Sequence, residues 1–260
     1  MTRLALPVYS LWLRELVRFY RQRSRIVGAL GSPLVFWLLI GSGLGRSFQA
    51  GPALPLEGGY LEYFYPGTLA LILLFTAIFS TISIIEDRQE GFLQGVLVAP
   101  VPRTAIVLGK VLGAATLAVV QGTVFLALAP LAKVPIHLAS VPALVGVMAL
   151  LSFGLSGLGF LVAWALDSSQ GFHAIMNVFL IPLWILSGAL FPASGAAGWV
   201  RGLMLANPMT YGVSALRHLL YDQPLPAEPS LALSVGVTAA FGFLMLAAGA
   251  VVVRRDARGR

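Results

Sequence analysis

Apolar runs of about twenty residues recur along the whole chain and constrain its fold more than any other feature. A helix needs about 20 apolar residues to cross the ~30 Å hydrocarbon core of a bilayer. Six such runs are present, at about 26–45, 66–85, 104–131, 141–166, 171–191 and 231–253. Hydrophobic residues make up 58% of the 260 residues and charged ones only 10%, which excludes a water-soluble domain. The sequence therefore predicts an all-α integral membrane protein with six transmembrane helices.

The first 25 residues differ from the apolar run that follows them. One face of a helix over residues 8–25 carries four arginines: Arg14, Arg18, Arg21 and Arg25. The opposite side is apolar and contains Trp12 and Phe19. A basic amphipathic helix of this kind lies in the lipid headgroup region, where its arginines face anionic lipid or an acidic protein surface. We predict an interface helix at 1–25 and a single six-span domain at 26–260.

The most polar internal segment, residues 86–110, separates the second and third runs. It begins with four charged side chains: Glu86, Asp87, Arg88 and Glu90. An amphipathic piece from Gly91 to Val98 follows, and Pro100 and Pro102 end it, because proline lacks an N–H and disfavours helix in the residue before it. A short helix at the membrane surface suits contact with a soluble partner. An ordinary loop that solvates two helix ends explains the same residues, so both interpretations stay open here.

Three local patterns carry further structural predictions. The aromatic run from Tyr60 to Tyr65 is typical of an interfacial belt, with Pro66 in the first turn of the second span. Pro182 is expected to break the fifth span. The segments Gly198–Leu205 and Thr210–Tyr221 are each too short to cross a bilayer, which favours re-entrant or interfacial helices before the last span.

Two GxxxG patterns, Gly41–Gly45 and Gly109–Gly113, indicate faces where helices pack closely. Lys110 lies inside the second pattern. A lysine near a span end can keep its stem in the apolar layer and its amine at the interface. We therefore expect the Lys110 amine to snorkel.

Basic residues divide unevenly between the two sides of the predicted topology. With both termini and the loops at 86–103 and 167–170 on one side, that side holds thirteen of the 17: Arg3, Arg14, Arg18, Arg21, Arg23, Arg25, Arg88, Arg103, Lys110, Arg254, Arg255, Arg258 and Arg260. The other side holds Arg46, Lys133, Arg201 and Arg217. Because cytoplasmic loops are enriched in Lys and Arg, both termini are predicted to be cytoplasmic.

Signatures of catalysis and of metal binding are absent from the sequence. It has no cysteine and none of the HExxH, GxSxG or GxxxxGK[ST] motifs. Its three histidines, His137, His173 and His218, are widely separated. The net charge of +7 comes from arginines beside spans, so nucleic acid is not an expected partner. We expect a protein that is not an enzyme, binds no cofactor or metal, and depends on a partner for any uphill transport.

An ion-gradient-driven secondary transporter is the alternative function, with a membrane enzyme or an assembly scaffold as a further one. Gradient-driven transporters usually place ionisable side chains inside their spans. Here the acidic residues lie at span ends or in loops, and the polar groups within spans are modest, such as Gln121, His173 and Asn177.

Three separated fragments resemble one family, the type-2 ABC exporter permeases. The fragments are Tyr63–Gly67, then Glu86–Gly91 continuing through Pro100–Arg103 to Gly109-Lys110, and Leu205–Tyr211 with Ala215–Arg217. They occur in the family's order, and the resemblance covers essentially the whole chain. The sequence departs from the family at Phe92-Leu93-Gln94, where a small residue and then an acidic one are more usual.

The resemblance implies a permease subunit of an ATP-driven exporter in the bacterial inner membrane. It implies a second permease subunit, as homodimer or heterodimer, and two copies of a cytoplasmic ATPase that bind ATP and magnesium. The exported substrate would be hydrophobic or amphipathic: a drug, a lipid, or a glycolipid or polysaccharide.

The resemblance also implies roles for particular residues. Residues 86–99 would be the coupling helix, and its ATPase-coupling residues would be Glu86, Asp87, Arg88, Glu90, Gly91, Leu93, Pro100 and Arg103. The interface helix would act through Arg14, Arg18, Arg21 and Arg25. The extracellular re-entrant region would involve Asn207, Pro208 and Arg217.

Overall fold

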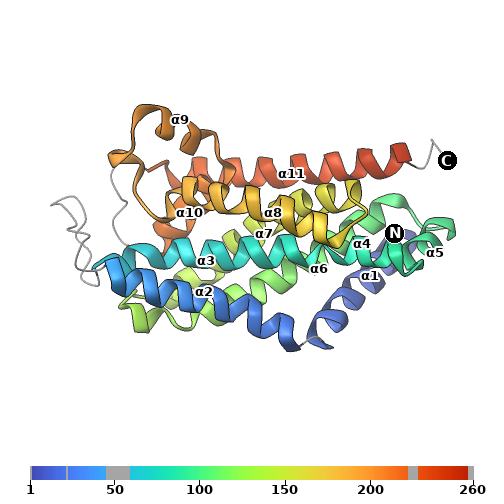
Figure 1. The fold of residues 1–260 in the computed structure, drawn as a ribbon, viewed down its shortest axis with the longest axis horizontal. Coiled ribbons are helices and arrows are strands. Elements are labelled where there is room, and N and C mark those ends of the chain that lie inside the picture. The colour runs from blue at the N-terminus through green and yellow to red at the C-terminus, as the bar shows by residue number, and fades with distance from the viewer. Residues whose placement is uncertain (1, 22, 45–58, 222–227, 257–260) are drawn as a thin grey trace.

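The computed structural model describes residues 2–21, 23–44, 59–221 and 228–256, and these residues form helices joined by short turns, without a strand (Figure 1). The helices are α1 (Thr2–Arg21), α2 (Arg23–Leu44), α3 (Gly59–Ser80), α4 (Ser83–Gln89), α5 (Phe92–Val98), α6 (Arg103–Leu126), α7 (Val141–Ala165), α8 (Ser169–Trp184), α9 (Gly198–Ala206), α10 (Pro208–Leu220) and α11 (Leu231–Asp256). Short 3-10 turns lie at Ala129–Ala132, Leu138–Ser140 and Ala193–Gly195, and a wide π turn at Ile185–Ala189 follows α8.

Five stretches of the described residues are long and apolar enough to cross a membrane: Gly59–Gln89, Arg103–Leu126, Leu138–Ala165, Ser169–Ala189 and Leu231–Arg255. The first of them contains both α3 and α4. The first predicted span corresponds to α2, in which the apolar helical stretch Pro33–Gly43 is shorter. The all-helical membrane class is thus confirmed.

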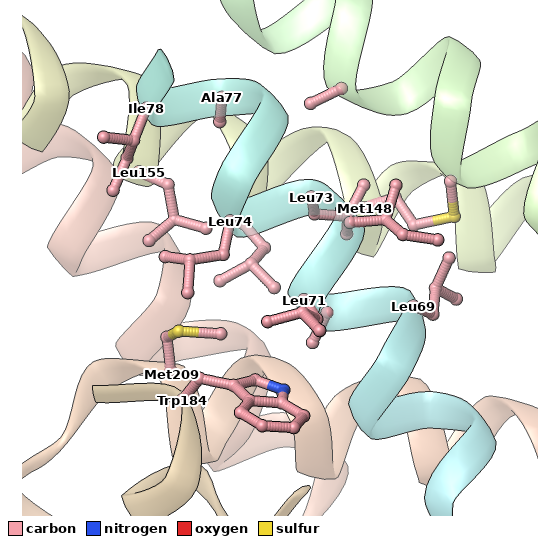
Figure 2. Packing of buried hydrophobic residues seen from close by; sticks show 14 of the residues in the cluster. Leu69, Leu71, Leu73, Leu74, Ala77, Ile78, Met148, Leu155, Trp184 and Met209 are labelled. Carbon is pink, nitrogen blue, oxygen red and sulfur yellow. The ribbon is translucent and has the colours of Figure 1, made fainter. Parts of the chain in front are cut away.

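Helix α3 forms the centre of the bundle and packs on α2, α6 and α7. Leu69 and Leu73 lie beside Met148 of α7, while Leu74 and Ile78 lie beside Leu155 (Figure 2). Trp184 and Met209 belong to the same cluster and lie at its lower edge in Figure 2. Because its side chains are buried on nearly all sides, α3 connects the two ends of the molecule through protein contacts.

The bundle has two distinct ends (Figure 1). Both termini, α4 and α5 lie at one of them, which we call the terminal end. Helix α9 and the start of α3 lie at the other, which we call the far end.

The predicted aromatic belt lies inside the protein. Tyr60, Tyr63, Phe64 and Tyr65 are all buried, and α3 begins at Gly59, so that Pro66 lies inside the helix. The prediction of an interfacial belt and of a span start at Pro66 is wrong, because these rings pack on other helices and the tyrosine hydroxyls donate to backbone carbonyls. Tyr65 Oη, for example, donates to the carbonyl of Phe125 at 2.8 Å, and the two rings stack.

The interruption after α8 does not occur at Pro182. The helix passes through this proline and continues to Trp184. The chain then widens into the π turn, where Gly188 adopts a left-handed conformation with φ of +81°. A residue with positive φ cannot continue a right-handed helix, so Gly188 marks the break.

Helix α1 packs against the second GxxxG pattern, which lies on α6. A Cβ atom added at Gly109 would lie 2.6 Å from Leu11 Cβ, and one added at Gly113 would lie 2.7 Å from Glu15 Cβ. No larger side chain fits there unless α1 shifts. The prediction of close helix packing at this pattern is confirmed. At the first pattern, Gly41 lies against Leu61 of α3, and Gly45 lies outside the described residues.

Candidate functional site

The polar segment between α3 and α6 forms two helices that meet at Gly91. This residue has φ of +78°, a left-handed conformation that favours glycine, and it separates α4 from α5. Helix α5 ends at Val98, the next residue Ala99 is extended as expected before Pro100, and Pro102 directly precedes α6. The stretch expected as one helix over 86–99 is therefore a bent pair, with α5 at the terminal end of the bundle (Figure 1).

Asp87 is the centre of an ion-pair network that joins α1, α4 and α6. Its carboxylate is 0% exposed. Arg14 donates two hydrogen bonds to it, at 2.6 and 2.7 Å, and Arg18 donates a third at 2.7 Å. The Lys110 amine also contacts the Asp87 carboxylate. Burial alone would lower the pKa of Arg14, but its hydrogen bond to Asp87 and the charge of that carboxylate raise it.

Glu15 is the second buried carboxylate of this network. It accepts from the Lys110 amine at 2.6 Å and from the Ser83 hydroxyl at 2.6 Å. Lys110 is only 3% exposed. The expectation that its amine snorkels to the interface is wrong, because α1 covers the glycine face of α6 and brings Glu15 to the amine. Two buried carboxylates thus face the cations of α1 and α6, as buried charges require.

The arginine face of α1 meets acidic residues of α4, and Glu90 directly after it, in the same chain. Arg18 reaches Glu86 at 2.9 Å and Glu90 at 3.2 Å in addition to Asp87. Arg21 is exposed, whereas Arg25 belongs to α2, and the placement of its side chain lies outside the described part of the chain. The expected contact with an acidic protein surface is therefore made within the chain itself.

The outward face of α1 is apolar. Its exposed side chains recur at helical spacing: Leu6, Tyr9, Leu13, Val17 and Tyr20. The face that packs on α6 instead contains Leu11, Glu15 and Phe19, which are buried. A membrane contact of α1 would therefore use the outward apolar stripe, and not the arginine face.

Arg88 connects α4 to the turn between α7 and α8. Its guanidinium donates to the backbone carbonyls of Trp164 at 2.8 Å and Leu166 at 3.1 Å, and to the Asp167 carboxylate at 2.6 Å. Gln89 donates to the Asp167 carbonyl at 2.9 Å. Two neighbouring residues of α4 thus hold opposite parts of the terminal end: Asp87 holds α1 and α6, and Arg88 holds the α7–α8 turn.

The remaining candidate residues of this segment differ in exposure. Leu93 is the buried residue of α5, and Arg103 is half-buried at the start of α6. The surface open to solvent contains Glu90, Gly91, Gln94, Val98 and Pro100. These exposed residues lie on α5 and on the residues that flank it.

Sequence reasoning missed Glu15, Ser83 and Asp167 as members of the site. Glu15 offered a signal, since it is the one acidic residue among the first 25 and interrupts a basic, apolar helix. Ser83 and Asp167 offered none, because their roles depend on which helices become neighbours.

At the far end, Asn207 and Pro208 begin α10. The Asn207 carboxamide oxygen accepts from the Met209 N–H at 2.9 Å and caps the helix, while its Nδ2 donates to the Leu183 carbonyl at 2.6 Å. Pro208 occupies the first turn, where a missing N–H costs nothing. The sequence-predicted residues Asn207 and Pro208 thus fasten α10 to the end of α8.

Arg217, on the same helix, is buried. Its Nη1 pairs with Glu228 at 2.6 Å and its Nη2 donates to the Gly188 carbonyl at 2.7 Å. Burial opposes its charge, but Tyr63 and Glu228 raise the pKa of Arg217 above its usual value, so the guanidinium stays protonated. Among the described residues, no cluster of three His, Asp or Glu side chains could hold a metal ion.

The family described as ABC-2 type transporter matches residues 7–221 of this chain. The chain belongs to the ABC-2 type transporter family. The three sequence fragments indicated a resemblance to type-2 ABC exporter permeases, and this resemblance is confirmed.

Individual relatives of this ABC-2 chain agree with that assignment. It is 28% identical over 218 residues to a putative transport permease, ycf38, of Cyanophora paradoxa, covering 82% of this chain and 73% of the relative. It is 25% identical over 221 residues to nodulation protein J of Sinorhizobium fredii, covering 83% and 81%. A 26% identity over 153 residues links it to the probable multidrug ABC transporter permease YbhR of Escherichia coli, covering 58% and 42%.

As an ABC-2 protein, the chain is a multi-pass membrane subunit for transport, in agreement with relatives that are named transport permeases. Membership of this family implies a partner ATPase subunit.

Proposed function

We propose that the chain is the permease subunit of an ATP-driven exporter, which forms the substrate pathway and couples to a separate cytoplasmic ATPase that binds ATP and magnesium. The observation that carries this proposal is the position of α5. It lies at the terminal end, exposes one face to solvent, and leads directly into α4 and α6.

Force applied to α5 would reach most of the bundle. Asp87, four residues before Gly91, holds α1 through Arg14 and α6 through Lys110. Arg88 holds the α7–α8 turn. Because α4 continues the line of the buried helix α3, a tilt of α5 and α4 would move these elements together. In this mechanism Glu90, Gly91 and Pro100 belong to the contact surface, and Asp87 and Arg88 transmit the movement.

The proposal includes six spans with both termini cytoplasmic, α2 being the first span. The described basic residues support this orientation: the terminal end carries Arg14, Arg18, Arg21, Arg88, Arg103, Lys110, Arg254 and Arg255, and the far end carries Lys133, Arg201 and Arg217. The far end would then face away from the cytoplasm. Residues 1–25 would act with α5 at the ATPase interface, and 26–260 would form one transmembrane domain.

The complete exporter would contain two ATPase copies and a second permease subunit, identical or related, in the inner membrane. Its substrate would be hydrophobic or amphipathic. Relatives named as a multidrug permease and as a nodulation protein support a drug or a lipid-linked saccharide as candidate classes.

Co-purification with a candidate ABC ATPase subunit tests the proposal, with ATP hydrolysis then measured in lipid. Val98→Asp changes the exposed face of α5, where Val98 is 85% exposed. Leu138→Asp is the matched control, since Leu138 is 86% exposed but precedes α7 at the far end. We expect Val98→Asp to weaken the complex or uncouple hydrolysis from transport, and Leu138→Asp to leave both intact.

Equal behaviour of the two variants, or no complex with any ATPase while the helices are folded, would contradict the proposal. Transport that persists after ATP is exhausted and follows an ion gradient would instead favour the secondary transporter.

A further inference from the structure

The carbonyl of Gly188 accepts two side-chain donors from different helices at the far end. Tyr63 of α3 donates through its hydroxyl at 2.9 Å, and Arg217 of α10 donates through Nη2 at 2.7 Å. The Arg217 guanidinium also lies over the Tyr63 ring, 4.4 Å from its centroid. Three elements that are distant in sequence therefore meet at one carbonyl oxygen.

Arg217 is fixed from its other side as well. Nη1 pairs with Glu228, which lies just before α11, at 2.6 Å. The planar guanidinium can bind a carboxylate and a carbonyl at once, which the single amine of a lysine cannot do in the same geometry. Arg217 thus joins α3, α10, the π turn and the start of α11 in a single buried contact.

The end of α8 depends on α10 for its hydrogen bonds. Asn207 Nδ2 donates to the Leu183 carbonyl at 2.6 Å, while the Thr210 hydroxyl donates to the Met204 carbonyl of α9 at 2.5 Å. Gly188 follows with positive φ, a conformation that the helix cannot propagate. Backbone carbonyls at membrane depth need partners, and here α10 supplies them. The π turn is therefore held in place by side-chain hydrogen bonds from Asn207 and Arg217, and such hydrogen bonds can break without unfolding a helix.

We propose that Arg217 is the positioning residue that keeps the far end closed, and that release of its hydrogen bond to the Gly188 carbonyl is the step that opens it. Ser187, Gly188 and Tyr63 are buried at this contact, and we take this arrangement as the closed state. Opening of the far end would release a substrate, and this role rests on the proposed function. The closure itself does not.

The absence of cysteine in this chain makes the test direct, because an introduced thiol is the only one present. Ser187→Cys places a thiol in the buried π turn, and Ser152→Cys places one in the buried middle of α7. Each is combined with Arg217→Lys, and labelling by a membrane-impermeant maleimide is timed for the full chain in nanodiscs without ATPase or ATP. Arg201→Lys, on the exposed surface of α9, is the matched control.

With Arg217→Lys we expect the thiol at position 187 to react about tenfold faster or more, in line with losing one hydrogen bond from a charged group. The thiol at position 152 should stay unreactive, and Arg201→Lys should change neither rate. Unchanged labelling at 187 would overturn the proposal. Equal acceleration at 187 and 152 would overturn it too, because that pattern means general loosening of the bundle.

A charge swap separates the carbonyl contact from the ion pair. Arg217→Glu combined with Glu228→Arg preserves an ion pair, but a carboxylate at position 217 cannot donate to the Gly188 carbonyl. We expect position 187 to remain fast in the double variant. Labelling at the slow wild-type rate would show that the ion pair alone closes the far end, and would overturn the role assigned to Gly188. Neither outcome depends on ATPase binding, so this test can fail while the proposed function stands.

Discussion

The carboxylate of Asp87 binds the guanidinium of Arg14 through two hydrogen bonds, at 2.6 and 2.7 Å, although 73 residues separate the two. This bidentate pair links the first helix directly to the segment that precedes α5. Since Lys110 contacts the same carboxylate, α6 belongs to the route as well. Movement of α4 relative to α1 would have to break a buried, charge-assisted contact.

Asp87→Asn should destabilise the bundle strongly. The substitution leaves Arg14, Arg18 and Lys110 around a neutral group, and breaking a buried ion pair from one side costs about 3–5 kcal/mol. Unfolding of the purified chain in detergent by heat or denaturant measures the loss. Glu90→Gln is the control, because Glu90 is exposed and its pair with Arg18 is worth about 1 kcal/mol or less. Similar losses for the two variants would refute the central role of Asp87.

Gly109→Val should displace α1 from α6. The added side chain would overlap Leu11, and overpacking of this kind costs about 1–3 kcal/mol. Limited trypsin digestion should then cut faster after Arg18 and Arg21. Gly146→Val on α7 is the control, since a Cβ atom there meets nothing within 4 Å. Unchanged cleavage in the Gly109 variant would show that α1 does not rely on this contact.

Local pattern was sufficient to predict most helices of this protein. The runs at 141–166 and 231–253 agree closely with α7 and α11, and the short segments before the last run correspond to α9 and α10. These features depend on length and hydropathy, which neighbouring residues determine. The glycine spacing at Gly109 and Gly113 likewise predicted close packing, though not which helix would pack there.

Features that depend on distant neighbours could not be predicted in this way. Lys110 and Glu15 are 95 positions apart, and nothing local to Lys110 indicates that α1 will cover it. The aromatic run from Tyr60 to Tyr65 has the composition of an interfacial belt, and only the positions of α2, α6, α8 and α10 show that the rings are internal. The exposure of α5 agrees with the polarity of its segment, whereas the buried network behind it was not predicted.

Arg88→Lys should loosen the turn between α7 and α8. A lysine cannot reproduce the fork that reaches the carbonyls of Trp164 and Leu166, so backbone amides near Asp167 should exchange faster with deuterium. Asp167→Asn separates the two contributions. The Asp167 side chain is 90% exposed, and its ion pair should contribute about 1 kcal/mol or less. If Asp167→Asn accelerated exchange as much as Arg88→Lys, the carbonyl contacts would not be what holds the turn.

Substitutions at Gly188 should rank by their tolerance of positive φ. The space is not limiting, since a Cβ atom would meet its nearest neighbour, Met204 Cε, at 3.6 Å. Backbone strain alone then predicts that Gly188→Ala costs about 1–2 kcal/mol, and that Gly188→Asn costs less because Asn adopts the left-handed region more readily. Gly198→Ala provides the baseline, because Gly198 is helical and nothing lies within 4 Å of an added Cβ atom. Thermal unfolding of the three variants measures the order, and an alanine variant as stable as the asparagine one would mean that the π turn relaxes to a conformation open to any residue.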